Sequence, residues 1–236
     1  MEGLPVLESI LCDTSMSTGV REKSAMAIAA LARFNKDVFV GQVLMGFTVR
    51  ALVLMGTRRS LQVLTFLVKL IKGHLVDDIE LNGEIPRIIS TLASQDISVQ
   101  TMAIDCILEM AYFSRKEGIE TMLKCGLIEK LVFLQRLEIG CDSNGANEED
   151  DRQGSGNCEE ADLEEEIERE DRETLKSRPF SGCVAGFSVQ VEVGSGTEKS
   201  EKKELKMEIL RRARDASVSE AEAATIVAEI LWGSSL

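Results

Sequence analysis

Proline, histidine and aromatic residues are scarce in this sequence. The 236 residues include three prolines and one histidine, and 4% of the residues are aromatic. This shortage argues against a large β-sandwich, because strands favour aromatic residues and the turns between them favour proline. No two cysteines have the C-x-x-C spacing, and only His74 could add a nitrogen ligand. A four-ligand zinc site therefore lacks its usual ligands.

Long apolar runs are also missing. No stretch of 18 apolar residues is present, so we expect no transmembrane segment. The first residues, MEGLPVLESILCD, have neither a basic stretch nor a long apolar core, so we expect no secretory signal. The dispersed cysteines fit a reducing compartment, and we expect an intracellular protein of the cytoplasm or nucleus. We expect Cys12, Cys106 and Cys125 to be small buried apolar residues.

Motifs that carry catalytic or cofactor chemistry are absent as well. There is no GxxxxGK[ST] loop, and the GSG triplets at 154–156 and 194–196 follow no strand, so we interpret both as linkers. A nucleophile–base pair cannot be built with one histidine, and we expect His74 in a surface role at a helix end. We therefore expect no enzyme activity, no cofactor and no metal. The net charge of −13 disfavours nucleic acid as a partner.

Four segments share a pattern in which glycine is followed by an amphipathic apolar run. They begin at Gly3, Gly46, Gly83 and Gly126, at spacings of 43, 37 and 43 residues. A period near 40 residues is typical of helical repeat units. We expect each glycine to adopt a left-handed backbone conformation where one helix ends and the next begins.

A longer helix is predicted after each of the first three glycine segments. These helices cover residues 20–35, a stretch from Ser60 and a stretch from Ser98. In the third, apolar residues recur every three to four positions, as on a buried helix face. They are Val99, Met102, Ala103, Cys106, Ile107, Met110 and Ala111. The fold class is therefore all-α.

This pattern resembles the armadillo repeat. The likeness is clearest over residues 83–113, where Gly-x-Ile leads through a polar turn to a helix that begins Val-Gln-x-x-Ala. It covers residues 3–137, with units that start near 3, 46, 83 and 126. The resemblance implies a short right-handed α-solenoid whose longest helices line a concave, protein-binding surface. The ending VSEAEAATIVAEILWGSSL also resembles a group of plant armadillo-repeat proteins.

Residues 138–178 form an acidic insertion that interrupts the fourth unit. Between Glu148 and Glu173 there are 14 Asp or Glu and 3 Arg, a local net charge of −11. Such a segment has too few apolar residues to offset the entropy of ordering, so we expect disorder. Its charge suggests that it could fold over a basic groove and compete with a partner.

Residues 179–236 are expected to complete the fourth unit and to cap the solenoid. Alternating apolar residues permit a strand over residues 180–193, but this is where the long helix of the fourth unit should lie, and both readings stay open. Two helices are predicted after Lys199, and a capping box is expected at Ser219 and Glu222. In the second helix we expect the packed stripe to be Ala224, Val227, Ala228 and Leu231.

The candidate binding residues follow from the resemblance. Armadillo import receptors carry Trp and Asn four residues apart on the groove helices. The matching pairs in this sequence contain neither, which weakens an import-receptor function: Ala29/Arg33, Thr65/Lys69 and Cys106/Met110. We take Arg33, Lys69, Lys72 and Met110 as tentative groove residues. Three of them are basic, so the groove should prefer an acidic protein or peptide.

The predicted function is that of a non-enzymatic scaffold for protein–protein interaction. One alternative is a substrate-recruiting or regulatory subunit of a ubiquitin-ligase system. Another is a structural relative with a vestigial groove. No partner and no oligomeric state follow from the sequence.

Overall fold

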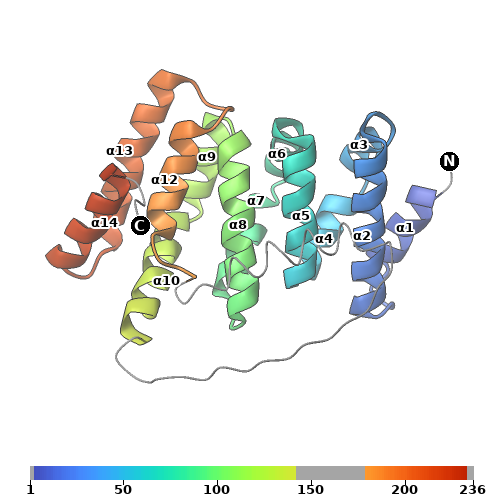
Figure 1. Ribbon diagram of the computed structural model, residues 1–236, viewed down its shortest axis with the longest axis horizontal. Helices are drawn as coiled ribbons and strands as arrows, with labels where there is room; N and C mark the ends of the chain where they lie inside the picture. The colour runs from blue at the N-terminus through green and yellow to red at the C-terminus, as the bar shows by residue number, and fades with distance from the viewer. Residues whose placement is uncertain (1–2, 142–178, 233–236) are drawn as a thin grey trace.

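The structure is a computed structural model, and it describes residues 3–141 and 179–232. Within these two ranges all regular structure is helical, as the sequence predicts. The helices are stacked along the long axis of the molecule, with α1 (Gly3–Cys12) and α14 (Glu220–Trp232) at opposite ends of the stack (Figure 1). The predicted acidic insertion falls mostly on residues 142–178, which lie outside the described residues.

Helices of three kinds alternate along the chain. We number them within a unit that begins with the helix before each repeat glycine, so the helix that follows the glycine is the second of its unit and the next one is the third. In the first three units the third helix is the longest, whereas in the fourth it has 11 residues and is shorter than α10, which has 15. The third helices stand side by side in one row (Figure 1). They are α2 (Thr18–Phe34), α5 (Arg58–Ile71), α8 (Ile97–Phe113) and α12 (Cys183–Val193). The helix over 183–193 settles the choice between helix and strand at that position in favour of the helix.

The first and second helices flank this row (Figure 1). The second helices are α1 (Gly3–Cys12), α4 (Thr48–Met55), α7 (Ile85–Ser90, continued by the 3-10 turn η1 at Thr91–Ala93), α10 (Leu127–Cys141) and α14 (Glu220–Trp232). The first helices are α3 (Lys36–Met45), α6 (Gly73–Leu81), α9 (Lys116–Lys124) and α13 (Lys199–Ala216). The last pair, α13 and α14, is the predicted C-terminal helical hairpin.

The core is one continuous apolar cluster that runs from α1 to α14. Each third helix buries residues against the second helix of its own unit and against the neighbouring third helices. In α5, nine of the 14 residues are buried, because neighbours cover the helix on three sides. A solenoid of this kind is stabilised by contacts between adjacent units only.

The glycines before the second helices do not all play the same role. Gly83 and Gly126 have φ values of +67° and +74°, so they adopt the left-handed conformation that we expected. Gly46 is not among the residues with positive φ. A Cβ atom there would overlap the Glu8 carboxylate and lie 2.9 Å from the backbone oxygen of Gln42. Gly46 is therefore needed for close packing and not for its backbone conformation.

The C-terminal hairpin is tied to the fourth unit by Arg136 of α10. Its guanidinium donates to both carboxylate oxygens of Glu222, with a shortest distance of 2.7 Å, and to the backbone oxygen of Ala216 at 3.0 Å. The hydrogen bond from Arg136 lowers the pKa of Glu222. The predicted capping box forms in part: Ser219 accepts from the amide of Glu222, whereas the Glu222 carboxylate accepts from the amide of Val218.

The loop at 194–197 is not the linker that the GSG triplet suggested. Ser195 donates its amide to the backbone oxygen of Tyr112 at 2.8 Å, and the Thr197 hydroxyl donates to the backbone oxygen of Ser114 at 3.0 Å. The loop thus satisfies carbonyls at the C-terminal end of α8 that have no partner within that helix. It is a packed joint between α12 and α13.

Candidate functional site

The outward surface of the third helices is the candidate functional site, and we call it the third-helix face. On each helix the exposed and half-buried residues recur on the side opposite the buried ones, and the row of helices joins them into one surface. On α2 and α5 the face comprises Lys23, Ala30, Phe34, Arg59, Phe66 and Lys69. On α8 and α12 it comprises Thr101, Asp105, Leu108, Tyr112, Val189 and Val193.

Charge is distributed unevenly over the third-helix face. The α2 and α5 half carries cations, whereas the α8 half carries carboxylates. The two halves meet where Lys69 on α5 lies 3.9 Å from Glu109 on α8. Among the described residues, Lys23 and Arg59 have no ion-pair partner. The predicted basic groove therefore extends over half of the face only.

Large apolar side chains are exposed on the same face. Phe34, at the end of α2, is 88% exposed. Phe66 and Leu108 lie partly buried against the core, and Leu108 packs beside Gly186 of α12. An exposed phenylalanine contributes nothing to the core, and a surface that combines exposed apolar side chains with charges is typical of interaction sites.

The four tentative groove residues lie in different environments. Arg33 is exposed on the side of α2 and interacts with another residue. Lys69 is on the third-helix face, in contact with Glu109. Lys72 lies just beyond the end of α5, on the rim. Met110 is 1% exposed and belongs to the core, so no partner can reach it in this structure. The reason is that Met110 lies on the buried side of α8, in line with Cys106 and Ile107.

A cavity of about 890 Å³ lies at the rim where α5 meets α6 and α8 meets α9. Lys72, His74 and the ion pair of Arg115 with Asp77, 2.8 Å long, line it. Lys72 is the one residue other than glycine with positive φ among the described residues, at +65°. His74 is exposed at the start of α6, which agrees with the surface role expected for it.

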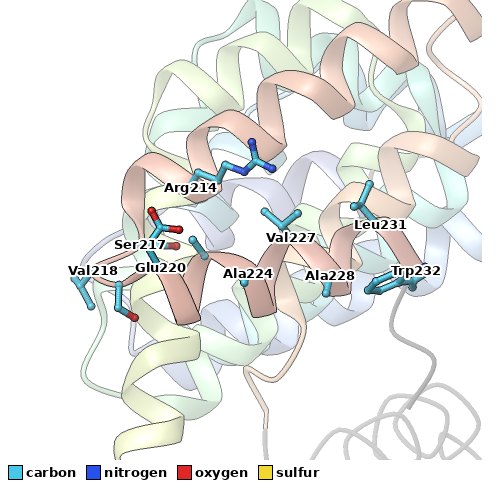
Figure 2. A pocket seen from close by; sticks show the side chains of 11 residues that line it. Arg214, Ser217, Val218, Glu220, Ala224, Val227, Ala228, Leu231 and Trp232 are labelled. Carbon is cyan, nitrogen blue, oxygen red and sulfur yellow. The ribbon is translucent and has the colours of Figure 1, made fainter.

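A second groove lies between the end of α13 and the outer side of α14, with a volume of about 780 Å³. We call it the terminal groove. Figure 2 shows Arg214 of α13 on one side and a line of small and apolar side chains along α14 on the other. The uncharged residues of its wall on α14 are Ala223, Ala224, Val227, Ala228, Leu231 and Trp232. The sequence placed four of these in the packed stripe, and that expectation is wrong for Ala224 and Leu231, which are exposed, whereas Val227 packs partly against the core. The fully buried residues of α14 are Ile226 and Ile230.

The four cysteines whose side chains the structure describes show no sign of reactive chemistry. Cys106 and Cys183 are buried, and burial raises the pKa of each thiol to about 12, so neither forms a thiolate at neutral pH. Cys125 is half-buried, whereas Cys12 is exposed and was wrongly expected in the core. Within residues 3–141 and 179–232, no group of His, Cys, Asp or Glu is arranged to hold a metal ion. No described helix has the length and hydropathy needed to cross a membrane.

Comparison with known proteins identifies the fold. No family model and no curated protein match the chain. A designed armadillo repeat protein, YIII(Dq)4CqI, is similar over 96% of this chain and 82% of its own length, with a TM-score of 0.55 and 15% identity. An engineered protein from the Northeast Structural Genomics Consortium is similar over 98% of this chain and 96% of its own, with a TM-score of 0.52 and 16% identity.

The fold is thus a short right-handed armadillo-like α-solenoid. At this identity the likeness establishes the arrangement of the helices and nothing about a ligand. In this chain the repeat consists of a second, a third and a first helix that follow one another in the same order along the stack.

Proposed function

We propose that the protein is a non-enzymatic scaffold that binds a partner protein through the third-helix face. The observation that carries this proposal is that the third-helix face holds Phe34, which is 88% exposed, together with the cations Lys23 on α2 and Arg59 on α5, which have no ion-pair partner among the described residues. A partner segment that buries an apolar side chain against Phe34 and brings carboxylates to the two cations would satisfy both features. Armadillo-like solenoids suit this role because their helices present one long continuous surface.

The cationic half of the face sets the chemistry of the partner. Lys69 already contacts Glu109, so its charge is partly compensated. Lys23 and Arg59 are left to attract an acidic segment, and attraction of this kind weakens as salt screens it. We propose the same partner class for the rim, where Lys72 has no ion-pair partner among the described residues.

Paired variants of equal exposure test the proposal. Phe34→Asp changes the third-helix face, whereas Leu81→Asp changes a residue of 86% exposure at the end of α6. Proteins captured from cells with the unchanged chain should be retained by the Leu81→Asp variant and lost with the Phe34→Asp variant. Equal capture by both variants contradicts the proposal.

Charge is tested in the same way. Lys23→Glu on the face and Lys203→Glu on α13 alter the net charge equally, and both lysines are exposed. We expect Lys23→Glu alone to weaken binding of the captured partner at low salt by about tenfold, which is about 1.4 kcal/mol. If both variants weaken binding equally, the effect belongs to net charge and not to the face.

We also propose a family relation and a cellular compartment, which rest on the sequence alone. The ending of the chain suggests a relation to plant armadillo-repeat proteins, and the scattered thiols suggest the cytoplasm or nucleus. The alternative of a recruiting subunit for a ubiquitin ligase is distinguished by one assay. A captured partner that is ubiquitinated only in the presence of this chain would favour that alternative over a plain scaffold.

A further inference from the structure

Helix α14 has two faces of opposite character. Glu222 and Glu229 point toward α10, where they pair with Arg136 and Gln135. The opposite side lines the terminal groove and carries no charged residue from Ala223 to Trp232 (Figure 2). Leu231 and Trp232 on this side are exposed, with Trp232 77% exposed. An exposed helix side of this length without charge is unusual for a solvated surface.

The preceding units show what covers such a helix. In every one, the third helix packs on the second helix: α2 on α1, α5 on α4, α8 on α7 and η1, and α12 on α10. In the part of the chain that the structure describes, α13 and α14 are the first and second helices of a unit with no third helix. The terminal groove therefore lies where the next third helix would pack.

The structure assigns to the terminal groove the binding of an amphipathic α-helix from a partner protein. The apolar stripe of the partner helix packs on Ala224, Val227, Ala228 and Leu231 of α14. The small or branched side chains of these residues allow a close approach of two helices. A carboxylate on the partner helix pairs with Arg214, which is exposed at the groove and has no ion-pair partner among the described residues. The partner helix thus completes the unpaired unit, at a site separate from the third-helix face.

No described helix of this chain can fill the groove of a second copy without leaving its own unit. Each of the third helices, α2, α5, α8 and α12, has its apolar side buried in its own core. Pulling one out would expose that side to water. Insertion of a free helix has no such penalty, and for this reason we assign the groove to a partner and not to a second copy.

Trp232 offers a direct measurement, because it is the only tryptophan in the sequence and it lines the groove. The probe is a synthetic peptide of residues 96–114, which is the α8 third helix with its Asp96 cap, carrying Cys106→Ala to prevent oxidation. This peptide contains no tryptophan and three carboxylates. We expect a saturable blue shift of the Trp232 emission when the full-length protein is titrated with the peptide.

Two pairs of variants locate the binding site. Ala224→Arg places a charged side chain in the groove, whereas Thr225→Arg changes the next residue, which is exposed but does not line the groove. We expect at least about tenfold weaker binding for Ala224→Arg only. Arg214→Glu should weaken binding in the same way, and a peptide with Asp105→Lys and Glu109→Lys should recover it. Lys203→Glu is the charge-matched control.

Three results would overturn the inference. The first is no saturable change of emission up to about 1 mM peptide. The second is equal binding by the Ala224→Arg and Thr225→Arg variants, which would place the peptide elsewhere on the molecule. The third is a dimer in sedimentation experiments on the protein alone that Ala224→Arg dissociates, since a second copy would then cover the groove. The Phe34→Asp variant tests the third-helix face only. Its effect on partner capture does not change the expected binding of the peptide to the terminal groove.

Discussion

Replacing Gly196 with alanine should damage the joint between α12 and α13 severely. A Cβ atom at this position would overlap the backbone oxygens of both Ser114 and Phe113. Neither oxygen can rotate away, because both belong to the end of α8. The loop itself must therefore shift outward to accept the methyl group.

The magnitude follows from what this shift breaks. The hydrogen bonds from Ser195 and Thr197 to the end of α8 would be lost, at about 1 kcal/mol each. Residual overlap in the packed joint adds about 1–3 kcal/mol. We expect the free energy of unfolding to fall by about 3–5 kcal/mol, and the melting temperature of a chain of this length to fall by roughly 10 °C.

Thermal unfolding followed by circular dichroism measures the global effect, and amide hydrogen exchange locates it. Because solenoid units contact only their neighbours, faster exchange should be concentrated in α12, α13 and α14. Gly41→Ala is the control, since a Cβ atom at Gly41 in α3 meets nothing within 4 Å. That variant should gain about 0.5–1 kcal/mol from reduced backbone entropy.

The reasoning is refuted by a Gly196→Ala protein whose stability lies within about 0.5 kcal/mol of the unchanged chain. It is also refuted by faster exchange spread evenly over all units. In either case the loop would not hold the end of α8 as tightly as the contacts indicate.

Four further predictions rest on local conformation, ionisation and burial. Lys72→Gly should stabilise the protein by about 1 kcal/mol in urea unfolding, because glycine relieves the positive φ at +65° at a smaller cost in backbone entropy; unchanged or lower stability would contradict this. Arg136 lowers the pKa of Glu222 below its usual 4.5, so the Glu222 carboxylate stabilises the fold above that pH. This contribution is lost as the pH falls through the lowered pKa. Glu222→Gln should therefore be less stable than the unchanged protein at pH 7 and should lose less stability on acidification. Glu80 is the opposite case, because burial and, to a smaller extent, the charge of Glu117 raise its pKa. Glu80→Gln should therefore be slightly more stable than the unchanged protein at pH 7 and should lose that advantage near pH 4. If the stabilities of the Glu222→Gln and Glu80→Gln variants respond equally to pH, neither pKa shift affects stability. In the native protein, alkylation mapped by mass spectrometry should spare Cys106 and Cys183, whose thiols are buried, and modification of either at the rate seen in urea would contradict their burial.

Periodicity was a good guide where neighbours bury a helix on several sides. The apolar positions of α8 were expected to be buried from their spacing, and six of the seven are. The repeat length placed a helix at 183–193, although alternation in that segment also permitted a strand. Position within a repeat was the stronger signal there, because a strand would have no neighbour with which to pair its backbone.

Periodicity failed where a helix has only one covered side. In α14 two apolar stripes compete: Ile226 with Ile230, and Ala224 with Val227, Ala228 and Leu231. The sequence contains both, and the packing of α14 on α12 and α13, together with the hydrogen bonds of Glu222 and Glu229 to α10, selects which one is buried. Met110 shows the same limit from the other direction. Correspondence with a family position suggested the groove, whereas the packing of α8 places Met110 in the core.

The repeat length, the all-helical class and the sites of the sharp turns are local properties, and they follow from the spacing of apolar residues and glycines along the chain. The surfaces depend on residues far apart in the sequence. The third-helix face joins side chains from four helices, the joint at 194–197 joins α8 to a loop about 80 residues later, and the terminal groove exists because α14 has no third helix packed on it among the described residues. Such features follow from which helix lies beside which, and that is set by the packing of the whole core.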